Sequence, residues 1–380
     1  MMTTNNKKLG LYIHIPFCVQ KCRYCGFLSF DRAGQDLHSA YVKALLRELA
    51  CWGEVAKEHK VDTIFLGGGT PSLLPGESIV EILEACQTHF SVADGAEVTM
   101  ESNPGTLSRE KMDLCFAAGV NRLSIGVQSL NGEILSFLGR IHTPEEAVQS
   151  YFEAREAGFS NINLDFMFGI PGQTQIQWEE TINRALSLSP EHLSFYGLQI
   201  EENTVFYDLL KKGELKETGD VTDRRMYHYA IDRLREKGYV HYEISNAAKP
   251  GFFCRHNMKY WSMEEYFGLG LGAHSWFNGF RSSNETKLET YLDGAKAVWV
   301  HKNTEKDTIS EYVFTGLRLI KGVSRSAFCH RFGVSIDELF ETEIQGHLKN
   351  GLLEESEDGD RIRLTSLGID LSNQVMADFV

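Results

Sequence analysis

Three cysteines stand close together near the start of the chain: Cys18, Cys22 and Cys25. They follow an apolar run that begins at Leu9 and ends at Pro16, which predicts a strand followed by a short cysteine-bearing loop. Spacings of four and three residues do not suit a disulfide, because one of the three thiols is left over, and a tetrahedral zinc site needs four ligands. Three thiolates do suit three irons of a [4Fe–4S] cube. The fourth iron then has no protein ligand and is open to a substrate or cofactor.

The setting of these cysteines favours thiolates, because Lys21 and Arg23 flank the second one. The alternative is that they are ordinary buried cysteines, since free cysteine is often buried. Five other cysteines are scattered along the chain: Cys51, Cys86, Cys115, Cys254 and Cys329. Cys51, Cys86 and Cys115 lie in helical patterns and are expected to pack in the core.

The elements that position the cysteine loop follow a regular alternation of strand and helix. Strands are expected at about 10–15, 63–66, 97–100, 122–127, 161–164 and 192–198, and helices at about 36–57, 77–89, 108–118, 132–138, 144–157 and 174–188. This alternation predicts an α/β fold with a parallel sheet. A closed barrel needs eight strand–helix units. Only six are counted, so we expect an open (β/α)6 partial barrel.

Polar residues follow the expected strands at the ends where a barrel of this kind carries its active site. Glu101, Gln128, Asp165 and Gln199 come at the ends of the third to sixth strands, and the cysteine loop follows the first. The run Gly67–Gly69, followed by Thr70, comes after the second strand, where residues without Cβ atoms let backbone approach a ligand closely. Taken singly, a polar residue at the end of a strand is more often a solvated loop residue, and the glycine run alone could be a tight turn. Together they predict one site along this rim of the sheet.

Composition narrows the class of protein. The 380 residues carry a formal charge of −14, which argues against a general nucleic-acid binder and against electrostatic attachment to anionic lipid. No apolar run is long enough to span a membrane, and the first eight residues are polar. The cysteine usage fits a reducing compartment. We therefore expect a cytoplasmic protein with no membrane span and no nucleic-acid partner.

Beyond Gln199 the alternation stops. Helices are expected at 206–212 and 222–237, and 242–245 resembles a strand. The segment Cys254–Trp261 and the glycines at 268, 270 and 272 suggest a pocket for a planar ligand, or else only a tight internal crossing. From about Glu305 helical patterns and two short strand-like runs, 352–354 and 361–365, predict a small, mainly helical domain with a winged-helix-like wing. The expected divisions are a partial barrel (1–200), a barrel extension (201–304) and a C-terminal domain (305–380).

The pattern Cys-x3-Cys-x2-Cys, with Tyr24 before the last cysteine, resembles that of the radical S-adenosylmethionine (SAM) superfamily. The resemblance implies the same partial barrel, a [4Fe–4S] cluster on Cys18, Cys22 and Cys25, SAM on the fourth iron, and an electron donor to the cluster. It also implies that one electron can cleave SAM to a 5′-deoxyadenosyl radical. The SAM contacts carried over by the resemblance are Tyr12, Tyr24, Gly68, Gly69, Thr70, Glu101, Gln128, Arg140 and Asp165. The alternative for Arg140 is a surface cation at a helix end.

Over its whole length the chain resembles the oxygen-independent coproporphyrinogen III oxidase-like family, through segments such as Tyr12–Pro16, Gly67–Ser72 and Asp165–Gln173. The oxidase branch carries a further cysteine two residues past the third, where this chain has Phe27, and a longer N-terminal extension. The segment His256–Trp261 resembles the heme-chaperone branch instead. Gly26, where that branch usually has Asp, departs from its pattern. A heme chaperone that hands heme to an apo-haemoprotein is therefore expected, with an oxidase of porphyrin biosynthesis as the alternative.

The resemblance leaves the heme site open, and residue chemistry suggests Cys254 and His256. Thiolate and imidazole are both established axial ligands of heme iron. The two residues lie two apart and would share a face on a strand. The alternative is an ordinary buried core. A homodimer is a further expectation.

Overall fold

The computed structural model describes residues 7–294 and 298–380. A 12-stranded sheet forms its centre, in the order β14-β13-β12-β11-β1-β4-β5-β6-β7-β8-β10-β9. The six strands in the middle are parallel and follow chain order: β1 (Lys7–Ile15), β4 (His59–Gly68), β5 (Ser91–Ser102), β6 (Arg122–Gln128), β7 (Ile162–Phe168) and β8 (His192–Gly197). The sheet has two edge strands, so the predicted open (β/α)6 arrangement is confirmed.

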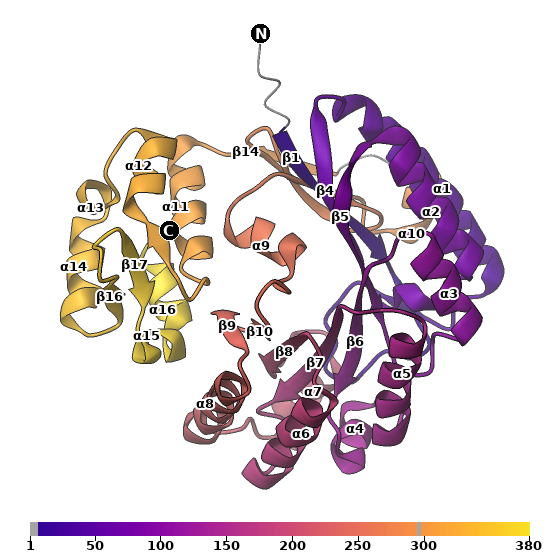
Figure 1. Cartoon of the computed structure of the whole chain (residues 1–380), viewed down its shortest axis with the longest axis horizontal. Helices are drawn as coiled ribbons and strands as arrows, with labels where there is room; N and C mark the ends of the chain where they lie inside the picture. Colours follow the sequence, from indigo (N-terminus) through magenta and orange to yellow (C-terminus); the bar gives the residue numbers. More distant parts are fainter. Residues whose placement is uncertain (1–6, 295–297) are drawn as a thin grey trace.

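Helices cover the outer face of this curved sheet (Figure 1). They are α1 (Gln35–Val55), α2 (Gly76–His89), α3 (Arg109–Ala117), α4 (Gly132–Leu138), α5 (Pro144–Glu156) and α6 (Gln175–Leu188). Ser108 caps α3 as expected, and Thr143 and Thr174 open α5 and α6 with capping boxes that satisfy the first free backbone N–H groups. The short elements β2 (Phe17–Cys18), β3 (Phe30–Asp31) and the 3-10 turn η1 (Pro71–Leu73) complete the loops near the cysteines.

The two faces of the sheet differ in polarity. Along β6, Leu123, Ile125 and Val127 pack into the main hydrophobic core beneath the helices. The alternate residues Arg122 and Ser124 line a cavity on the inner face. Successive side chains of a strand point to opposite faces, so one strand supplies both the core and the cavity.

Residues 201–304 extend the sheet at both edges. β11 (Tyr266–Leu269) pairs in parallel with β1, and β12 (His274–Phe277), β13 (Phe280–Ser283) and β14 (Trp299–Lys302) follow antiparallel. At the other edge β9 (Val240–Glu243) and β10 (Asn246–Ala248) add a hairpin. Helices α7 (Val205–Lys211) and α8 (Asp220–Glu236) match the prediction, and α9 (Arg255–Trp261) and α10 (Leu288–Leu292) were not expected.

Internal packing accounts for the glycines near β11. A Cβ on Gly268 would lie 2.0 Å from the backbone oxygen of His274. Gly270 has φ +96, and a Cβ there would lie 2.6 Å from the backbone oxygen of His14. The tight crossing is therefore the correct reading of these glycines, and they give no support to a pocket for a planar ligand.

The C-terminal part has a hydrophobic cluster of its own, from Ile309 to Phe379. It contains α11 (Glu305–Gly316), α12 (Arg325–Phe332), α13 (Ile336–Leu339), α14 (Glu341–Lys349), α15 (Ser366–Asp370) and α16 (Ser372–Ala377). Its wing has three strands where two were expected: β15 (Val323–Ser324), β17 (Arg361–Leu364) and β16 (Leu353–Glu355). In Figure 1 this part faces the inner side of the sheet, with α9 between them.

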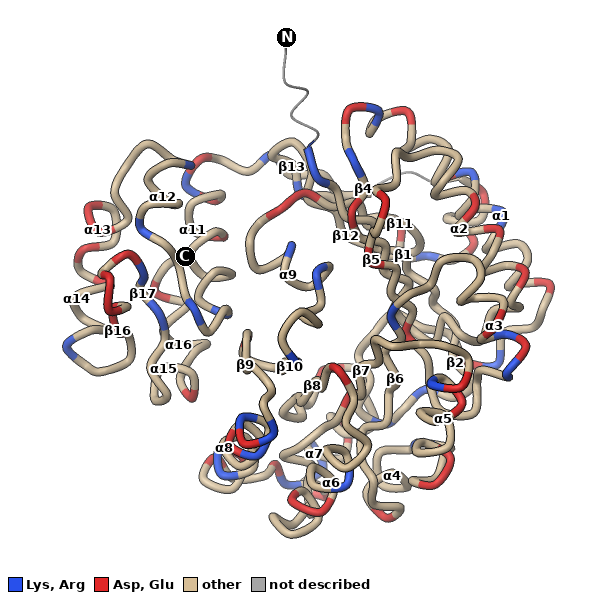
Figure 2. Tube along the Cα trace, viewed as in Figure 1, with Lys and Arg blue, Asp and Glu red and all other residues tan. Residues whose placement is uncertain are grey.

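Charges are spread along the outer helices, where acidic residues alternate with Lys and Arg (Figure 2). Among the residues described, none of the helices is long and apolar enough to cross a membrane. Cys86 and Cys115 are buried as expected, but Cys51 is exposed, so its predicted place in the core is wrong. The helical pattern gave the element correctly but not the face on which this residue lies.

Candidate functional site

The cysteine loop follows β1 directly and is held from several sides. The backbone N–H of Arg23 donates to the carbonyl of Leu138 at the end of α4 (3.0 Å), and the carbonyl of Arg23 accepts from Phe206 in α7 (3.1 Å). Cys18, Cys22 and Cys25 are each half-buried. The loop is thus fixed by elements distant in sequence, while its thiols keep access to a ligand.

The glycine loop after β4 packs directly on the cysteine loop. The backbone N–H of Gly69 donates to Ile15 at the end of β1 (2.9 Å), and a Cβ on Gly69 would lie 2.7 Å from the backbone oxygen of Phe17. Gly68 has φ +116, and a Cβ there would strike the ring of His14 at 2.6 Å. Thr70 donates its hydroxyl to the sulfur of Cys18 (3.6 Å). Both glycines are needed for this close approach, whatever ligand they also contact.

The donor set fits a cluster better than a single ion. In the described ranges, no three His, Cys, Asp or Glu side chains are placed to hold one metal ion together. A cube does not require such convergence, because each thiolate binds a different iron. Burial raises the pKa of the Cys18 and Cys25 thiols, so the expectation that the flanking cations make them thiolates is wrong for the metal-free protein. Iron binds the deprotonated form, so its binding would release these protons. Cys18, Cys22 and Cys25 therefore fit the role of holding three irons of a [4Fe–4S] cluster, which supplies single electrons when bound.

Arg140 lies beside the cysteine loop. Its guanidinium donates to the sulfur of Cys22 (3.6 Å), to the carbonyl of Gly126 (2.6 Å) and to the side-chain oxygen of Asn103. Asn103 in turn donates to the hydroxyl of Thr70 (2.8 Å). Sequence analysis missed Asn103; its place directly after the third strand, in Glu101-Ser102-Asn103, was the available signal. The surface-cation reading of Arg140 is wrong, because the side chain joins three elements around the loop.

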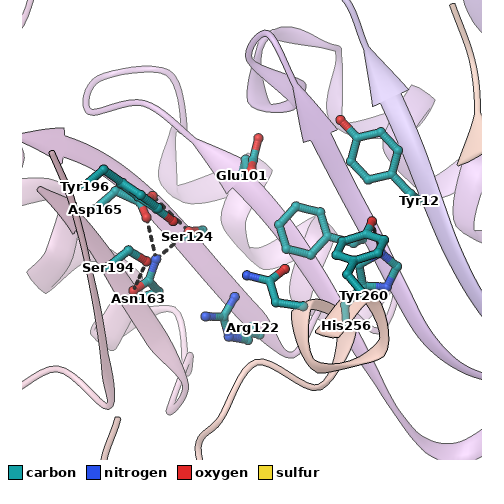
Figure 3. Close-up of a pocket in the computed structure, with 12 residues that line it drawn as sticks. Tyr12, Glu101, Arg122, Ser124, Asn163, Asp165, Ser194, Tyr196, His256 and Tyr260 are labelled. Carbon is teal, nitrogen blue, oxygen red and sulfur yellow. Dashed lines mark hydrogen bonds between the residues drawn. The ribbon is translucent and has the colours of Figure 1, made fainter. Parts of the chain in front are cut away.

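A cavity of about 200 Å³ opens on the inner face of the sheet, with Tyr12, Glu101 and Asp165 in its wall (Figure 3). A smaller cavity of about 30 Å³ is lined by Cys22, Thr70 and Arg140. The hydrogen bond from the Gly68 N–H to Glu101 (3.0 Å) links the glycine loop to the larger cavity. The predicted SAM contacts thus fall mainly into two neighbouring groups around the ends of β1, β4 and β5.

Two residues predicted at strand ends, Asp165 and Gln199, lie differently from the expectation, and two predicted SAM contacts, Gln128 and Tyr24, line neither cavity. Asp165 stands in the middle of β7, which runs on to Phe168, so it does not end a strand. Gln128 ends β6 with φ +66 but lines neither cavity, and Gln199 is exposed in the loop after β8. Tyr24 packs against an apolar cluster that includes Leu138 and Phe206. Strand ends inferred from composition are therefore accurate only to a few residues.

The electrostatics of the larger cavity favour a cationic ligand. Burial, together with repulsion from Asp165, raises the pKa of Glu101 to about 8. Burial also raises the pKa of Asp165, although Ser124 and Asn163 donate hydrogen bonds to it at 3.0 and 2.8 Å. A positive charge placed between these two acids would ionise both. The sulfonium and ammonium groups of SAM supply such charge, so the residues fit this cofactor.

Cys254 and His256 do not lie on a strand; the expectation of a shared strand face is wrong. Cys254 caps α9 and His256 stands in its first turn, with exposed fractions of 0% and 1%. The ring of His256 is hydrogen-bonded on both sides, to Thr63 (2.9 Å) and to Tyr260 (2.8 Å), and burial lowers its pKa to about 3. These contacts match an ordinary buried core. The start of α9 is fixed by Glu97, which accepts hydrogen bonds from the backbone N–H groups of Arg255 and His256, and this long-range contact has no local sequence signal.

The half-barrel with three cysteines after its first strand defines a radical SAM protein, and the radical SAM superfamily model matches residues 12–185. The model of the HemN C-terminal domain matches residues 303–371. The solved coproporphyrinogen III oxidase (HemN) from Escherichia coli superposes with a TM-score of 0.86 over 99% of this chain and 90% of that one, at 23% identity, which shows the shared fold.

Curated relatives narrow the family. The heme chaperone HemW of Bacillus subtilis is 39% identical over 97% of this chain and 98% of its own. HemW of Escherichia coli is 38% identical over 90% and 91%. The chain belongs to the HemW family. Membership of the radical SAM superfamily implies a [4Fe–4S] cluster and SAM as cofactors.

Proposed function

We propose that this protein is a heme chaperone of the cytoplasm. It binds heme, carries a [4Fe–4S] cluster with SAM, and transfers heme to an apo-haemoprotein. The observation that carries the proposal is the similarity over nearly the whole length to proteins named heme chaperone, at 39% identity for the relative from Bacillus subtilis. Partners of this function are heme, the acceptor apo-haemoprotein and an electron donor to the cluster, and the active form is a homodimer.

The site residues take the following roles in this proposal. Cys18, Cys22 and Cys25 hold the cluster. Tyr12, Glu101, Asp165 and Arg140 contact SAM, with Gly68, Gly69 and Thr70 around it. Gln128 and Tyr24 stay predicted contacts, although they line neither cavity. Two contacts support this arrangement: Arg140 bonds Cys22 in the wall of the smaller cavity, and Glu101 in the wall of the larger cavity bonds the glycine loop at Gly68.

The competing function is decarboxylation of coproporphyrinogen III by an oxidase of the same fold. The likeness of fold to the oxidase favours it. Phe27 speaks against it, because this position holds a hydrophobic side chain, 69% exposed, where the oxidases carry a further cysteine. The chaperone is therefore preferred.

Anaerobic heme titration separates the two functions. We expect a saturable Soret band for the cluster-loaded protein, and loss of that band to apomyoglobin added as a test acceptor. The same preparation should give no decarboxylated product from coproporphyrinogen, SAM and dithionite. Product formation without a Soret band would replace the chaperone by the oxidase.

The heme ligand is tested in the same titration. If Cys254 or His256 binds heme iron, Cys254→Ser or His256→Ala should shift the Soret band while the cluster and SAM affinity persist. If the two residues only pack α9 against β4, these variants should lower the melting temperature and leave the spectrum of bound heme unchanged. The buried hydrogen bonds of His256 support the second outcome.

A further inference from the structure

Arg122 is the first residue of β6 and stands in the wall of the larger cavity (Figure 3). Its exposed fraction is 2%, and its Nε has no hydrogen-bond partner. Figure 3 draws no hydrogen bond between Arg122 and the other residues of the cavity wall, whereas Asn163, Asp165 and Ser194 are joined in a network. Within the described residues, then, this guanidinium faces the cavity without a bonded partner.

Such a side chain is unusual. Arginine stays protonated in proteins and carries five N–H donors, so a buried one is almost always paired. The acids near Arg122 bond elsewhere: Glu97 accepts from the backbone N–H groups of Arg255 and His256 at 3.0 Å each, and Asp165 accepts from Ser124 and Asn163. These acids offset the charge of Arg122 without accepting its hydrogen bonds, so the N–H donors of this buried guanidinium are unused within the described part of the chain.

The cavity around Arg122 has room for a small polar group. Its volume of about 200 Å³ is below the range of about 300–1,000 Å³ typical of pockets for drug-sized ligands. Hydroxyl and amide groups of Ser124, Asn163, Ser194 and Tyr196 also face it. Glu101 and Asp165 stand in the wall of the same cavity, and the positive charge of Arg122 offsets theirs.

We propose that Arg122 binds a carboxylate group at the floor of this cavity, as a subsite distinct from the cluster and from the SAM contacts above it. A planar guanidinium matches a carboxylate with two parallel hydrogen bonds. The carboxylate belongs either to a small free organic acid or to one carboxylate arm of a larger ligand, such as a propionate of heme. The macrocycle itself does not fit the volume.

A stability measurement tests whether Arg122 serves the fold or a ligand. Without a ligand, Arg122→Met removes a buried cation that makes no hydrogen bond to the residues described but offsets the charges of Glu97 and Asp165, so the melting temperature should fall by less than in a variant that breaks a bonded pair. Arg155, half-buried and paired with Glu191 at 2.5 Å, is the matched control. Arg155→Met should lower the melting temperature by several degrees. An equal fall in both variants would show that Arg122 is structural and would overturn the subsite.

Titration with sodium propionate tests the ligand class, using the anaerobically reconstituted full chain and sodium chloride at equal ionic strength. The wild-type melting temperature should rise saturably with propionate, and Arg122→Met should lose at least tenfold in apparent affinity. Arg122→Lys keeps the positive charge but not the two parallel N–H donors of the guanidinium, so it should retain part of the rise in melting temperature with propionate. Arg255→Gln, which removes an exposed cation of α9, should respond like the wild type.

Heme and heme dimethyl ester distinguish the two sources of the carboxylate. If a propionate arm occupies the subsite, esterification weakens heme binding in the wild type by about as much as Arg122→Met does, and the two changes together cost no more than one. If a free acid occupies the subsite, Arg122→Met weakens the binding of propionate but leaves the affinity for heme unchanged. The subsite is rejected if Arg122→Met alters neither the propionate response nor the effect of esterification. A protein that binds propionate through Arg122 but never binds heme would refute the chaperone function and keep the subsite.

Discussion

The guanidinium of Arg140 donates to the sulfur of Cys22 at 3.6 Å, although 118 residues separate the two in the chain. The contact joins the end of α4 to the cysteine loop and places a fixed positive charge beside one cluster ligand. A cation and hydrogen-bond donor near a cluster sulfur stabilise the reduced, more negative cluster.

Replacing Arg140 by Ala should therefore have two effects. SAM binding should weaken by about 2–5 kcal/mol, much of it because the SAM carboxylate is left unpaired. The reduction potential of the cluster should fall by on the order of 50 mV, the equivalent of about 1 kcal/mol for one electron. Calorimetry and a redox titration measure these. Arg184→Ala, at a partly exposed cation of α6, is the control, and an unchanged SAM affinity in Arg140→Ala would reject the carboxylate contact.

Alanine at Cys18, Cys22 or Cys25 should each remove most of the iron and the broad brown absorption of the reconstituted protein, because a cube held by three thiolates loses one of them. Iron content and the visible spectrum measure this. Cys51→Ala, at an exposed cysteine of α1, should keep both. Full iron retention in all three loop variants would refute the cluster ligands.

The pKa of Glu101 predicts how stability without SAM depends on pH. Its value of about 8 in the fold lies above the ordinary 4.5, so the folded protein holds this proton more tightly than the unfolded chain does. The stabilisation from this group is complete below about pH 4.5 and is lost as pH rises to about 8. Glu101→Gln should flatten this decline by about 2–4 kcal/mol.

Urea unfolding at a series of pH values measures the difference between wild type and Glu101→Gln. Glu110→Gln is the control, because hydrogen bonds within its own helix turn lower the pKa of that exposed carboxyl, and its loss cannot remove a decline toward high pH. A parallel pH dependence in wild type and Glu101→Gln would show that Glu101 is not protonated in the fold. SAM should raise the free energy of unfolding of the wild-type protein, and this increase should be largest near pH 8, where the protein without SAM has lost the contribution of Glu101.

Gly69→Ala should disturb the cysteine loop without touching a cysteine. A Cβ at this position would lie 2.7 Å from the backbone oxygen of Phe17, so the loop must move. We expect a loss of about 1–3 kcal/mol in the free energy of unfolding and poorer cluster incorporation. Gly132→Ala, in α4 with open space around it, is the control. Wild-type stability and iron content in Gly69→Ala would mean that the two loops are not packed as described.

The order of the six parallel strands and their helices could be predicted from sequence because apolar runs, caps and glycines mark each unit locally. The cysteine loop was equally local. The sheet extension could not be predicted in this way: β11 has only four residues, and its pairing with β1 is a long-range contact that no local pattern reports. The same holds for α9, whose residues also suited a strand.

The polar inner face was within reach of sequence analysis but was missed. Arg122, Ser124 and Gln128 alternate with apolar residues along one strand, as do Asn163 and Asp165 along the next. A buried parallel strand is usually apolar on both faces. Polar residues at every second position of such a strand therefore indicate a polar cavity on one face of the sheet. The sequence prediction used only the ends of strands, so it placed Asp165 at the end of the fifth strand and did not include Arg122 among the site residues.

The pairing of β11 with β1, which begins at Gly10 and Tyr266, has a consequence for biosynthesis. A ribosome delivers the first strand and its cysteines early, but the neighbour that completes one side of that strand emerges only after about two-thirds of the chain. Until then β1 presents an open hydrogen-bonding edge, which is a template for wrong pairing. Contacts of such long range also slow folding. Before translation ends, the cysteine loop follows a strand that has not yet paired with β11. We therefore expect the cluster to be inserted after release of the full chain.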